Sequence, residues 1–246
     1  MPDVLAGQTA LILGGGGGIG RATAEALAAR GVRLALADID PVRLDAAAAS
    51  LPSTGHDLRT YVIDVRLRDE VRNLVEAVVG DFGRLDILVN AAGIMSIKRV
   101  IELDTDEWEH TIDLNIKGTL WGIAAVLPVF VQQRSGHLVT LGSIHGLKVF
   151  DGGAVHSASK FAVRAFSEGL RAELAAYGVR VTTVMPGAVA TGMEDKTTGS
   201  QRDAIRTIYA DAIPPAAVAN AVVFAIEQCD SVAVNEIVVR PTVQQW

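Results

Sequence analysis

The chain has 246 residues, half of them hydrophobic and a fifth charged, and a formal net charge of −6 at pH 7. The charge is spread without a basic block, which argues against a nucleic-acid partner. The N-terminus lacks the features of a signal sequence, and no later run reaches the roughly 18 apolar residues of a membrane span. The single cysteine, Cys229, excludes an internal disulfide framework, suits a reducing compartment and is expected to be buried or half-buried. We therefore expect a cytoplasmic protein without nucleic-acid or membrane partners.

The first element is an apolar run, Thr9–Leu13, that stops at five consecutive glycines and is followed by a helix-compatible segment at residues 21–30. This order predicts a strand, a tight turn and a helix. Glycine lets a bulky anion touch the backbone of such a turn, and the first N–H groups of the helix face that anion. The pattern indicates a phosphate site at Gly14, Gly18, Ile19 and Gly20, with a flexible loop as the alternative.

A second apolar strand, residues 32–37, runs into Asp38, which lies 18 residues past Gly20. In a dinucleotide-binding fold, an acidic side chain at about this distance accepts hydrogen bonds from the adenosine ribose hydroxyls and repels a 2′-phosphate. The sequence therefore favours NAD over NADP. The alternative is an aspartate that only begins the turn before Pro41.

Strands and helices continue to alternate to the end of the chain. The periodicity predicts helices at 41–51, around 71–78, from 105 toward 121, at 152–177 and at 214–228, and strands at 58–63, 85–89, 136–143, 179–185 and 236–239. Such alternation predicts one domain with a parallel sheet, right-handed crossovers and helices on both faces. Residues 188–212 are polar and mixed, and we expect a mobile lid there.

Polar or small residues stand at several positions where a ligand could bind. The fourth predicted strand ends in Asn90-Ala91-Ala92-Gly93, which lets a planar ring or a sugar lie against the backbone or simply makes a tight turn. Asn115 lies inside a predicted helix, so it either faces solvent or has a function. Ser143 ends the fifth strand, and His156 and Lys160 lie one turn apart on one helix face.

Taken together, these motifs resemble the short-chain dehydrogenase/reductase family nearly from end to end. The matching elements are the Gly14–Gly18–Gly20 turn, Asp38, Asp64-Val65, Asn90 to Gly93, Asn115, Ser143, residues 156–162, Pro186-Gly187 with Thr191, and residues 235–242. The resemblance implies an α/β fold of the Rossmann-like, doubly wound type, with about seven parallel strands in a single domain over residues 1–246.

The resemblance also implies an activity, namely NAD-dependent interconversion of a secondary alcohol and a carbonyl. Ser143 would hydrogen-bond the substrate oxygen, Lys160 would bind the nicotinamide ribose and lower the pKa of the neighbouring acid, and Asn115 would organise a proton-carrying water. The resemblance implies no metal ion, and it implies that the protein is a homotetramer. The cofactor would be held by Gly14, Gly18, Ile19, Gly20, Asp38, Asp64, Val65, Asn90, Ala91, Gly93, Lys160, Pro186, Gly187 and Thr191.

The chain departs from the family pattern at two positions. Leu13 stands where a threonine usually braces the glycine turn, and His156 stands where the family has tyrosine in a Tyr-x-x-x-Lys motif. His156 could itself be the acid/base, although imidazole is shorter than phenol and would need a water or a displaced substrate. The fold could instead serve other chemistry or cofactor binding alone, or the chain could be a tyrosine-to-histidine variant of an ordinary member.

The substrate site is expected to be formed by residues 94–97, 144–155 and 188–212. Residues 94–97 and 144–155 are mainly apolar with few charges, which favours a small, uncharged and moderately hydrophobic substrate. His145 either lines this site or is a loop histidine without a role, and Tyr177 does not replace the missing tyrosine. If His156 is the acid/base, we expect activity to follow a group that titrates near neutrality.

Overall fold

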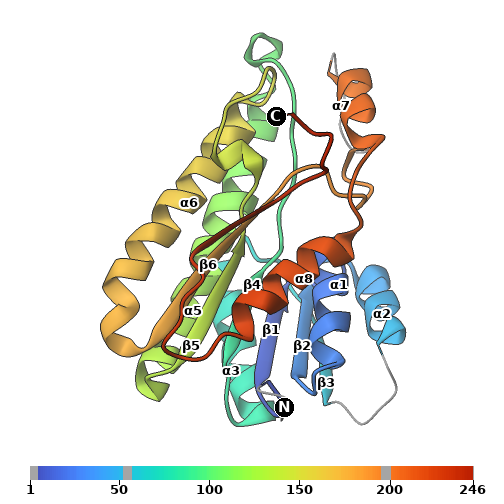
Figure 1. The fold of residues 1–246 in the computed structure, drawn as a ribbon. Coiled ribbons are helices and arrows are strands. Elements are labelled where there is room, and N and C mark those ends of the chain that lie inside the picture. The colour runs from blue at the N-terminus through green and yellow to red at the C-terminus, as the bar shows by residue number, and fades with distance from the viewer. Residues whose placement is uncertain (1–4, 52–56, 195–200, 246) are drawn as a thin grey trace.

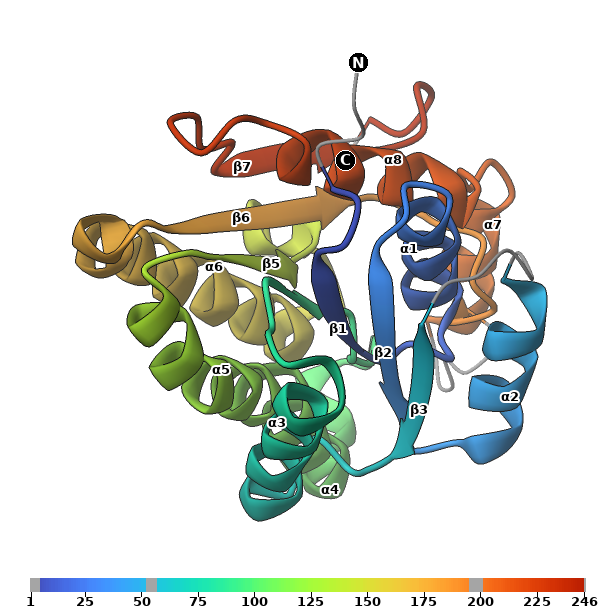
Figure 2. The same ribbon diagram turned by 90° about the horizontal axis from the view of Figure 1, so that it is seen from below.

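Seven parallel strands form one sheet in the order β3-β2-β1-β4-β5-β6-β7, as Figures 1 and 2 show. The structure is a computed structural model that describes residues 5–51, 57–194 and 201–245. The strands are β1 (Thr9–Leu13), β2 (Arg33–Asp38), β3 (Leu58–Val62), β4 (Ile87–Asn90), β5 (Gly136–Leu141), β6 (Val179–Pro186) and β7 (Glu236–Val239). The predicted doubly wound α/β fold is confirmed.

Helices cover both faces of the sheet. Helices α1, α2 and α8 pack on one face, and α3, α5 and α6 pack on the other (Figure 2). The helices are α1 (Gly18–Ala28), α2 (Pro41–Ser50), α3 (Arg68–Phe82), α4 (Thr105–Thr111), α5 (Thr119–Gln133), α6 (Ala154–Leu174), α7 (Arg202–Tyr209) and α8 (Pro215–Ile226). Each face thus has its own apolar core.

The central strand β1 shows why the strands are nearly continuous apolar runs. Ile12 belongs to the core beneath α1 and α8, whereas Leu11 and Leu13 belong to the core beneath α3 and α5, and all three are buried. When a parallel strand is covered on both faces, all of its side chains are shielded from water. Its sequence is therefore apolar throughout and does not alternate between apolar and polar residues. Burial of the apolar side chains on both faces is the main favourable term that holds the layers together.

The strand order reverses between β1 and β4, and this reversal positions the site. The chain leaves β1 toward β2 and β3 on one side, then returns to β4 and continues to β7 on the other. The two sets of crossovers diverge at this point, so a crevice opens outside the carboxyl ends of the strands. The glycine turn after β1 and the segment after β4 therefore face each other across it.

Several predicted boundaries were wrong. Helix α1 begins at Gly18, inside the glycine run. The helix predicted from Thr105 toward Trp121 is α4, then a π-helical segment at Ile112–Gly118, then α5 as far as Gln133. Thr119 donates a hydrogen bond from its hydroxyl to the carbonyl of Asn115 (2.9 Å), which gives that carbonyl a side-chain partner within the widened turn.

The predicted lid at residues 188–212 contains a helix that the polar composition did not indicate. Helix α7 follows residues 195–200, which lie outside the described residues. It is short and strongly amphipathic, and Ile205 is its buried contact. The intrinsic helix propensity of so short a segment is too weak to form a stable helix. The packing of the apolar side of α7 against the rest of the protein therefore stabilises it.

Two expectations about exposure also need correction. Cys229 is exposed, because it lies beyond the end of α8 rather than in the core. Within the described part of the chain, the continuous helical stretch Thr105–Gln133 is long and apolar enough to cross a membrane by length and composition, with a mean hydropathy of 1.6. Core helices of globular proteins meet the same criterion, and α5 within this stretch packs on β4, β5 and α3.

A histidine in the middle of the sheet makes the fold sensitive to acid. His137 on β5 is 1% exposed, and its Nε2 lies 2.7 Å from the hydroxyl oxygen of Thr182. That hydroxyl donates its hydrogen to the carbonyl of Val234 (2.6 Å), so it accepts from Nε2–H. Nδ1 has no hydrogen-bond partner among the residues that the structure describes. Burial, aided by the charge of Arg180, lowers the pKa of His137 to about 3.

We predict that acid destabilises the protein through His137. Between pH 6.5 and about 3 the unfolded chain binds a proton at this residue and the folded chain does not, so the free energy of unfolding falls as pH falls. One such group contributes at most about 1.4 kcal/mol per pH unit. Urea unfolding between pH 7.5 and 5 should show a shallower dependence for His137→Gln. Thr140→Val, a buried control on the same strand, should keep the wild-type slope, and an unchanged slope in His137→Gln would contradict this prediction.

Candidate active site

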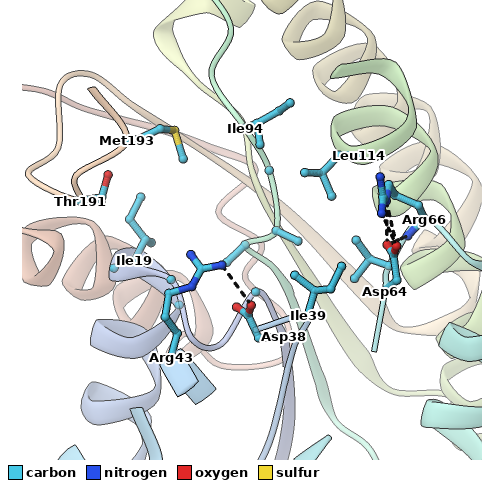
Figure 3. Close-up of a pocket in the computed structure, with 18 of the residues that line it drawn as sticks. Ile19, Asp38, Ile39, Arg43, Asp64, Arg66, Ile94, Leu114, Thr191 and Met193 are labelled. Carbon is cyan, nitrogen blue, oxygen red and sulfur yellow. Dashed lines mark hydrogen bonds and ion pairs between the residues drawn. The ribbon is translucent and has the colours of Figure 1, made fainter. Parts of the chain in front are cut away.

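Two adjoining cavities occupy the crevice at the carboxyl ends of β1 and β4. The larger, of about 390 Å³, extends from the glycine turn to the end of β3, and Figure 3 shows it with Asp64 and Arg66 on one side and Thr191 and Met193 on the other. The smaller, of about 90 Å³, lies toward β5 and α6. Both are lined by Ile19, Thr191, Met193 and residues 91–94. The site is therefore one continuous depression with two chemically different ends.

The glycine turn packs so closely that side chains are excluded from it. A Cβ atom on Gly14 would lie 2.6 Å from the backbone nitrogen of Ala92, and one on Gly20 would lie 2.1 Å from the carbonyl oxygen of Gly14. Gly14 also has a φ of 82°, a conformation that only glycine adopts freely. Gly18, Ile19 and Gly20 begin α1 and line the cavity, where the first N–H groups of a helix lack intrahelical acceptors. The turn is thus a backbone cradle with the positive end of a helix dipole directed into it.

Asp38 stands at the end of β2 on the floor of the larger cavity. Its carboxylate is buried and accepts hydrogen bonds from the backbone N–H of Gly16 (3.0 Å) and of Asp40 (3.1 Å). Asp38 thus supports the next turn, as one interpretation of the sequence had it, and it also lines the cavity. The guanidinium of Arg43 lies 3.6 Å from the carboxylate, as Figure 3 shows. Arg43 also lines the cavity, and sequence reasoning missed it although it follows Asp38 by only five residues.

A second ion pair borders the far end of the larger cavity. The carboxylate of Asp64 accepts two hydrogen bonds from Nε of Arg66, each 2.9 Å long. Hydrogen bonds from Arg66 hold the pKa of Asp64 below its usual range. Sequence analysis identified Asp64 and Val65, which both line the cavity, but it missed Arg66 and His110 beside them. No periodicity singles out these two, because they come from a loop and from α4 and meet only in the folded chain.

The smaller cavity brings together three of the residues that the sequence singled out. Ser143, His156 and Lys160 all line it, although they come from the end of β5 and from α6. Ser143 accepts a hydrogen bond from the backbone N–H of His145 (3.1 Å), which leaves its own hydroxyl hydrogen free to donate. Lys160 donates a hydrogen bond from Nζ to the carbonyl of Leu141 at the end of β5 (3.0 Å). Pro186 and Gly187 at the end of β6 line the same cavity.

Burial strongly changes the titration of the two bases on α6. His156 is 4% exposed, and burial, then the charge of Lys160, then His145, lower its pKa well below 6.5. Burial also lowers the pKa of Lys160 to about 8. The imidazole is therefore neutral at pH 7, while the ammonium keeps most of its charge. The expectation of a group that titrates near neutrality is wrong for the free protein, because the sequence alone did not show how deeply His156 is buried.

His145 lies behind His156 and does not line either cavity. The two imidazole rings meet edge to face, with centroids 4.9 Å apart, and His145 also contacts the ring of Phe150 at 4.5 Å. The Nδ1 atom of His145 lies 3.1 Å from the hydroxyl oxygen of Ser157. Burial, followed by the charge of Lys160, lowers the pKa of His145 to about 4. His145 is thus a neutral packing partner of His156 and not a wall of the substrate site.

Two asparagines that the sequence singled out lie outside the walls of both cavities. Asn90 is buried, and its side chain points toward α5, where a Cβ on Gly122 would lie 2.6 Å from its Oδ1 atom. Asn115 is 1% exposed, so the interpretation as a solvent-facing residue is wrong. Its Oδ1 accepts from the backbone N–H of Ile94 (2.9 Å), and its Nδ2 donates to the carbonyl of Ile94 (3.0 Å) and to the hydroxyl of Ser159 (3.1 Å). Asn115 therefore joins the segment after β4 to α6.

Comparison with known proteins now identifies the family. A family profile described as short chain dehydrogenase matches residues 8–202. The chain belongs to the short-chain dehydrogenase family. An uncharacterised oxidoreductase of Staphylococcus saprophyticus is 40% identical over 241 residues, which are 96% of this chain and 97% of that protein.

Solved structures of the short-chain dehydrogenase type agree with the fold. NAD⁺-bound xylitol dehydrogenase superposes with a TM-score of 0.86 at 29% identity and covers 95% of this chain and 98% of its own. Serine dehydrogenase complexed with NADP⁺ superposes with a TM-score of 0.89 at 28% identity and covers 97% of each chain. This chain is accordingly an oxidoreductase of the short-chain dehydrogenase type.

In this short-chain dehydrogenase, we predict that Asn115 is needed for stability as well as for the shape of the site. Asn115→Ala would leave the N–H and the carbonyl of Ile94 without their partner, and an unsatisfied buried group costs about 1–3 kcal/mol. Chemical denaturation should show a loss of that size. The matched control is Asn73→Ala on the exposed side of α3, which should change the free energy of unfolding by less than about 0.5 kcal/mol. Equal losses in the two variants would show that Asn115 does not hold the segment in place.

Proposed function

We propose that this protein is an NAD-dependent oxidoreductase that interconverts a secondary alcohol and a carbonyl on a small, moderately hydrophobic substrate. The observation that carries the proposal is the convergence of Ser143, His156 and Lys160 on one cavity of about 90 Å³. That cavity adjoins the larger one, which is lined by the glycine turn and Asp38. A site for the reacting atoms thus lies beside a site that suits a dinucleotide.

The residues of the larger cavity fit a nicotinamide dinucleotide. The turn around Gly14 excludes side chains and directs helix N–H groups at the position suited to a pyrophosphate. Asp64 and Val65 would border the adenine, and Pro186, Gly187 and Thr191 would border the nicotinamide end. Gly93 and Ala91 leave room for the sugars, and Asn90 would act by supporting that segment from beneath. When bound, the cofactor supplies the hydride.

The charge at Asp38 supports NAD as the preferred cofactor. A buried carboxylate at the end of β2 suits two ribose hydroxyls, and it opposes the negative charge of a 2′-phosphate. Arg43 acts in the opposite direction, but its guanidinium is shared between Asp38 and Asp40 and is 44% exposed. The carboxylate is the more buried charge, so its repulsion is screened less than the attraction of Arg43.

We predict that Asp38→Ser makes the enzyme accept NADP. Removing the carboxylate ends the repulsion and releases Arg43 to pair with a 2′-phosphate, which should raise the ratio of kcat/KM for NADP over NAD on the order of 10- to 100-fold. Steady-state kinetics with both cofactors measure this ratio. Asp45→Ser, on the exposed side of α2, is the matched control and should leave the ratio unchanged. A ratio that stays at the wild-type value in Asp38→Ser would contradict a role for Asp38 in cofactor choice.

The residues of the smaller cavity can orient the substrate and move one proton. Ser143 donates its free hydroxyl hydrogen to the substrate oxygen. The neutral ring of His156 accepts the alcohol proton during oxidation, through a water molecule because the ring is short and buried. The ammonium of Lys160 binds ribose hydroxyls, and its charge adds to the effect of burial in keeping the neighbouring ring neutral.

The amide of Asn115 supports the same proton path. Within the described residues, its Oδ1 accepts a hydrogen bond from the backbone N–H of Ile94, which leaves one lone pair for another donor. This oxygen and Nζ of Lys160 lie 3.1 Å and 3.8 Å from the point where a Cβ on Gly93 would stand. Because glycine has no side chain, both groups stay open on the side of Gly93, where a water within reach of both would link them. Asn115 would thus hold a water beside Lys160 although it does not line the cavity itself.

The decisive experiment measures turnover with NAD⁺ across a panel of secondary alcohols, and then its dependence on pH. We expect kcat/KM for alcohol oxidation to persist as pH falls through 6.5, because the imidazole of His156 stays neutral. It should decline above about pH 8, where Lys160 loses its charge. In His156→Tyr the acid limb should move to higher pH, because a phenol gives up its proton less readily than an imidazolium.

Controls separate catalysis from cofactor binding alone. Lys160→Ala should abolish turnover, whereas Lys117→Ala, an exposed lysine paired with Asp113, should keep it. If the wild type binds NADH and shows no turnover with any alcohol or ketone, the protein is a cofactor-binding module. A large gain of activity in His156→Tyr would instead indicate that the chain is a variant of an ordinary tyrosine enzyme.

We also propose a homotetramer in the cytoplasm, without nucleic-acid or membrane partners. Large apolar side chains remain exposed on two faces of the molecule, Phe161 and Phe166 on α6 and Phe224 and Val238 on α8 and β7. Exposed apolar patches of this kind support interfaces between copies of a chain. The net charge of −6 and the absence of a basic block support the remaining assignments.

A further inference from the structure

A phenol enters the smaller cavity from the side opposite α6. Tyr209, the last residue of α7, lines this cavity together with Ser143 and His156. Figure 1 shows α7 beyond the sheet, on the side of α8 and α1. Tyr209 therefore brings a hydroxyl to the reacting end of the site from the predicted lid, in which sequence analysis named Thr191 but not this tyrosine.

Among the residues that the structure describes, the hydroxyl of Tyr209 has one hydrogen-bond partner, and that partner is weak. It donates to the thioether sulfur of Met95, which follows β4, at 3.3 Å. A thioether is a poor acceptor, so an oxygen atom of a ligand would replace it at little cost. The other two tyrosines differ, because Tyr61 donates to Asp81 at 2.6 Å and Tyr177 is exposed at the end of α6. Tyr209 is thus the one tyrosine of the chain placed to bind a ligand in this cavity.

The surroundings of Tyr209 favour a binding role over an acid/base role. Burial, followed by the negative charge of Glu194, raises the pKa of its phenol to about 12. A phenol that holds its proton so firmly donates a hydrogen bond at every working pH but is a poor proton donor in catalysis. One buried carboxylate oxygen of Glu194 has no hydrogen-bond partner in the described structure. Tyr209 is therefore suited to bind a ligand oxygen rather than to transfer a proton.

Much of the wall of this cavity is apolar. Ile94, Met95, Leu141 and Met193 line the cavity along with Ser143 and Tyr209. A ligand that satisfies both hydroxyls needs an oxygen function at each end and a short hydrocarbon part between them. A simple alcohol or ketone would use Ser143 alone and leave Tyr209 on its sulfur partner.

We propose that Tyr209 is a specificity-determining residue that binds a second oxygen function of the substrate, so that the substrate class is a small diketone, hydroxyketone or diol. This inference rests on the proposed function, in which Ser143 binds the reacting oxygen. The hydroxyl of Tyr209 donates to the distal oxygen, and the apolar wall contacts the carbon chain between the two oxygens.

The test compares matched ketones with NADH as the reductant. The probes are 2,3-butanedione, 2,4-pentanedione and 2,5-hexanedione, each paired with the methyl ketone of the same chain length. We expect the wild type to prefer at least one diketone over its partner ketone. In Tyr209→Phe the KM for that diketone should rise about 3- to 10-fold, which corresponds to one hydrogen bond, while kcat and the values for the methyl ketone stay within about twofold.

Two further variants separate binding from a structural role. Tyr177→Phe is the matched control and should behave as the wild type. If the only role of the Tyr209 hydroxyl were to attach α7 to Met95, Met95→Leu would remove the preference for the diketone just as Tyr209→Phe does. That result would overturn the proposal. Equal losses for diketone and methyl ketone in Tyr209→Phe, or no loss for either, would overturn it as well.

A binding measurement keeps this test apart from the proposed catalysis. The fluorescence of enzyme-bound NADH gives the dissociation constant of each ketone even when no turnover occurs. Tighter binding of a diketone that is lost in Tyr209→Phe, without turnover, would support this inference while the catalytic proposal fails. The wild type could instead turn over methyl ketones and diketones with equal KM and bind both equally tightly. That result would support the proposed catalysis and overturn the role of Tyr209.

Discussion

The site depends on how closely two chain segments approach each other where the strand order reverses. The turn after β1 and the segment after β4 touch backbone to backbone at Gly14 and Ala92, and no Cβ fits between them. The same turn meets the start of α1 at Gly20. Because these contacts involve only backbone atoms, the free N–H groups and the wall of the cavity are fixed by the same packing that holds the sheet together. A side chain on Gly14 would push these two segments apart, and it would also fill part of the crevice between them.

The π-helical segment extends this constraint to the catalytic end. It places Asn115 where one amide can bond to both backbone groups of Ile94 and to Ser159, and thereby connects β4, the cavity wall and α6. Extra turns of this kind within helices occur frequently at functional sites. The cost of the widened turn is offset by three hydrogen bonds in a buried place, where each unmade bond would cost more than it does at the surface.

Burial, more than any single charge, determines the chemistry available in the smaller cavity. It is the largest cause of the lowered pKa values of His156, His145 and Lys160. The result is a neutral imidazole beside an ammonium whose pKa of about 8 is close to the working pH. His156 and Lys160, one helical turn apart, therefore differ in charge. Neighbouring groups whose pKa values are set apart in this way can take different roles in acid/base chemistry.

The sequence by itself determined the layered α/β architecture and most of the groups around the carboxyl ends of the strands. It could do so because buried parallel strands must be apolar throughout and because the glycines and Asp38 are required by contacts within one local unit. The convergence of Ser143, His156 and Lys160 followed from their places at a strand end and on one helix face.

Tertiary structure alone decided the rest. Arg66 and His110, Tyr209 and the backing of His156 by His145 arise where distant segments pack, and local periodicity carries no record of such contacts. The widened turn at Asn115 and the short helix α7 likewise depend on hydrogen bonds and on one buried side chain from elsewhere in the chain. Depth of burial, which sets the pKa of His156, is a property of the packed molecule and not of any motif.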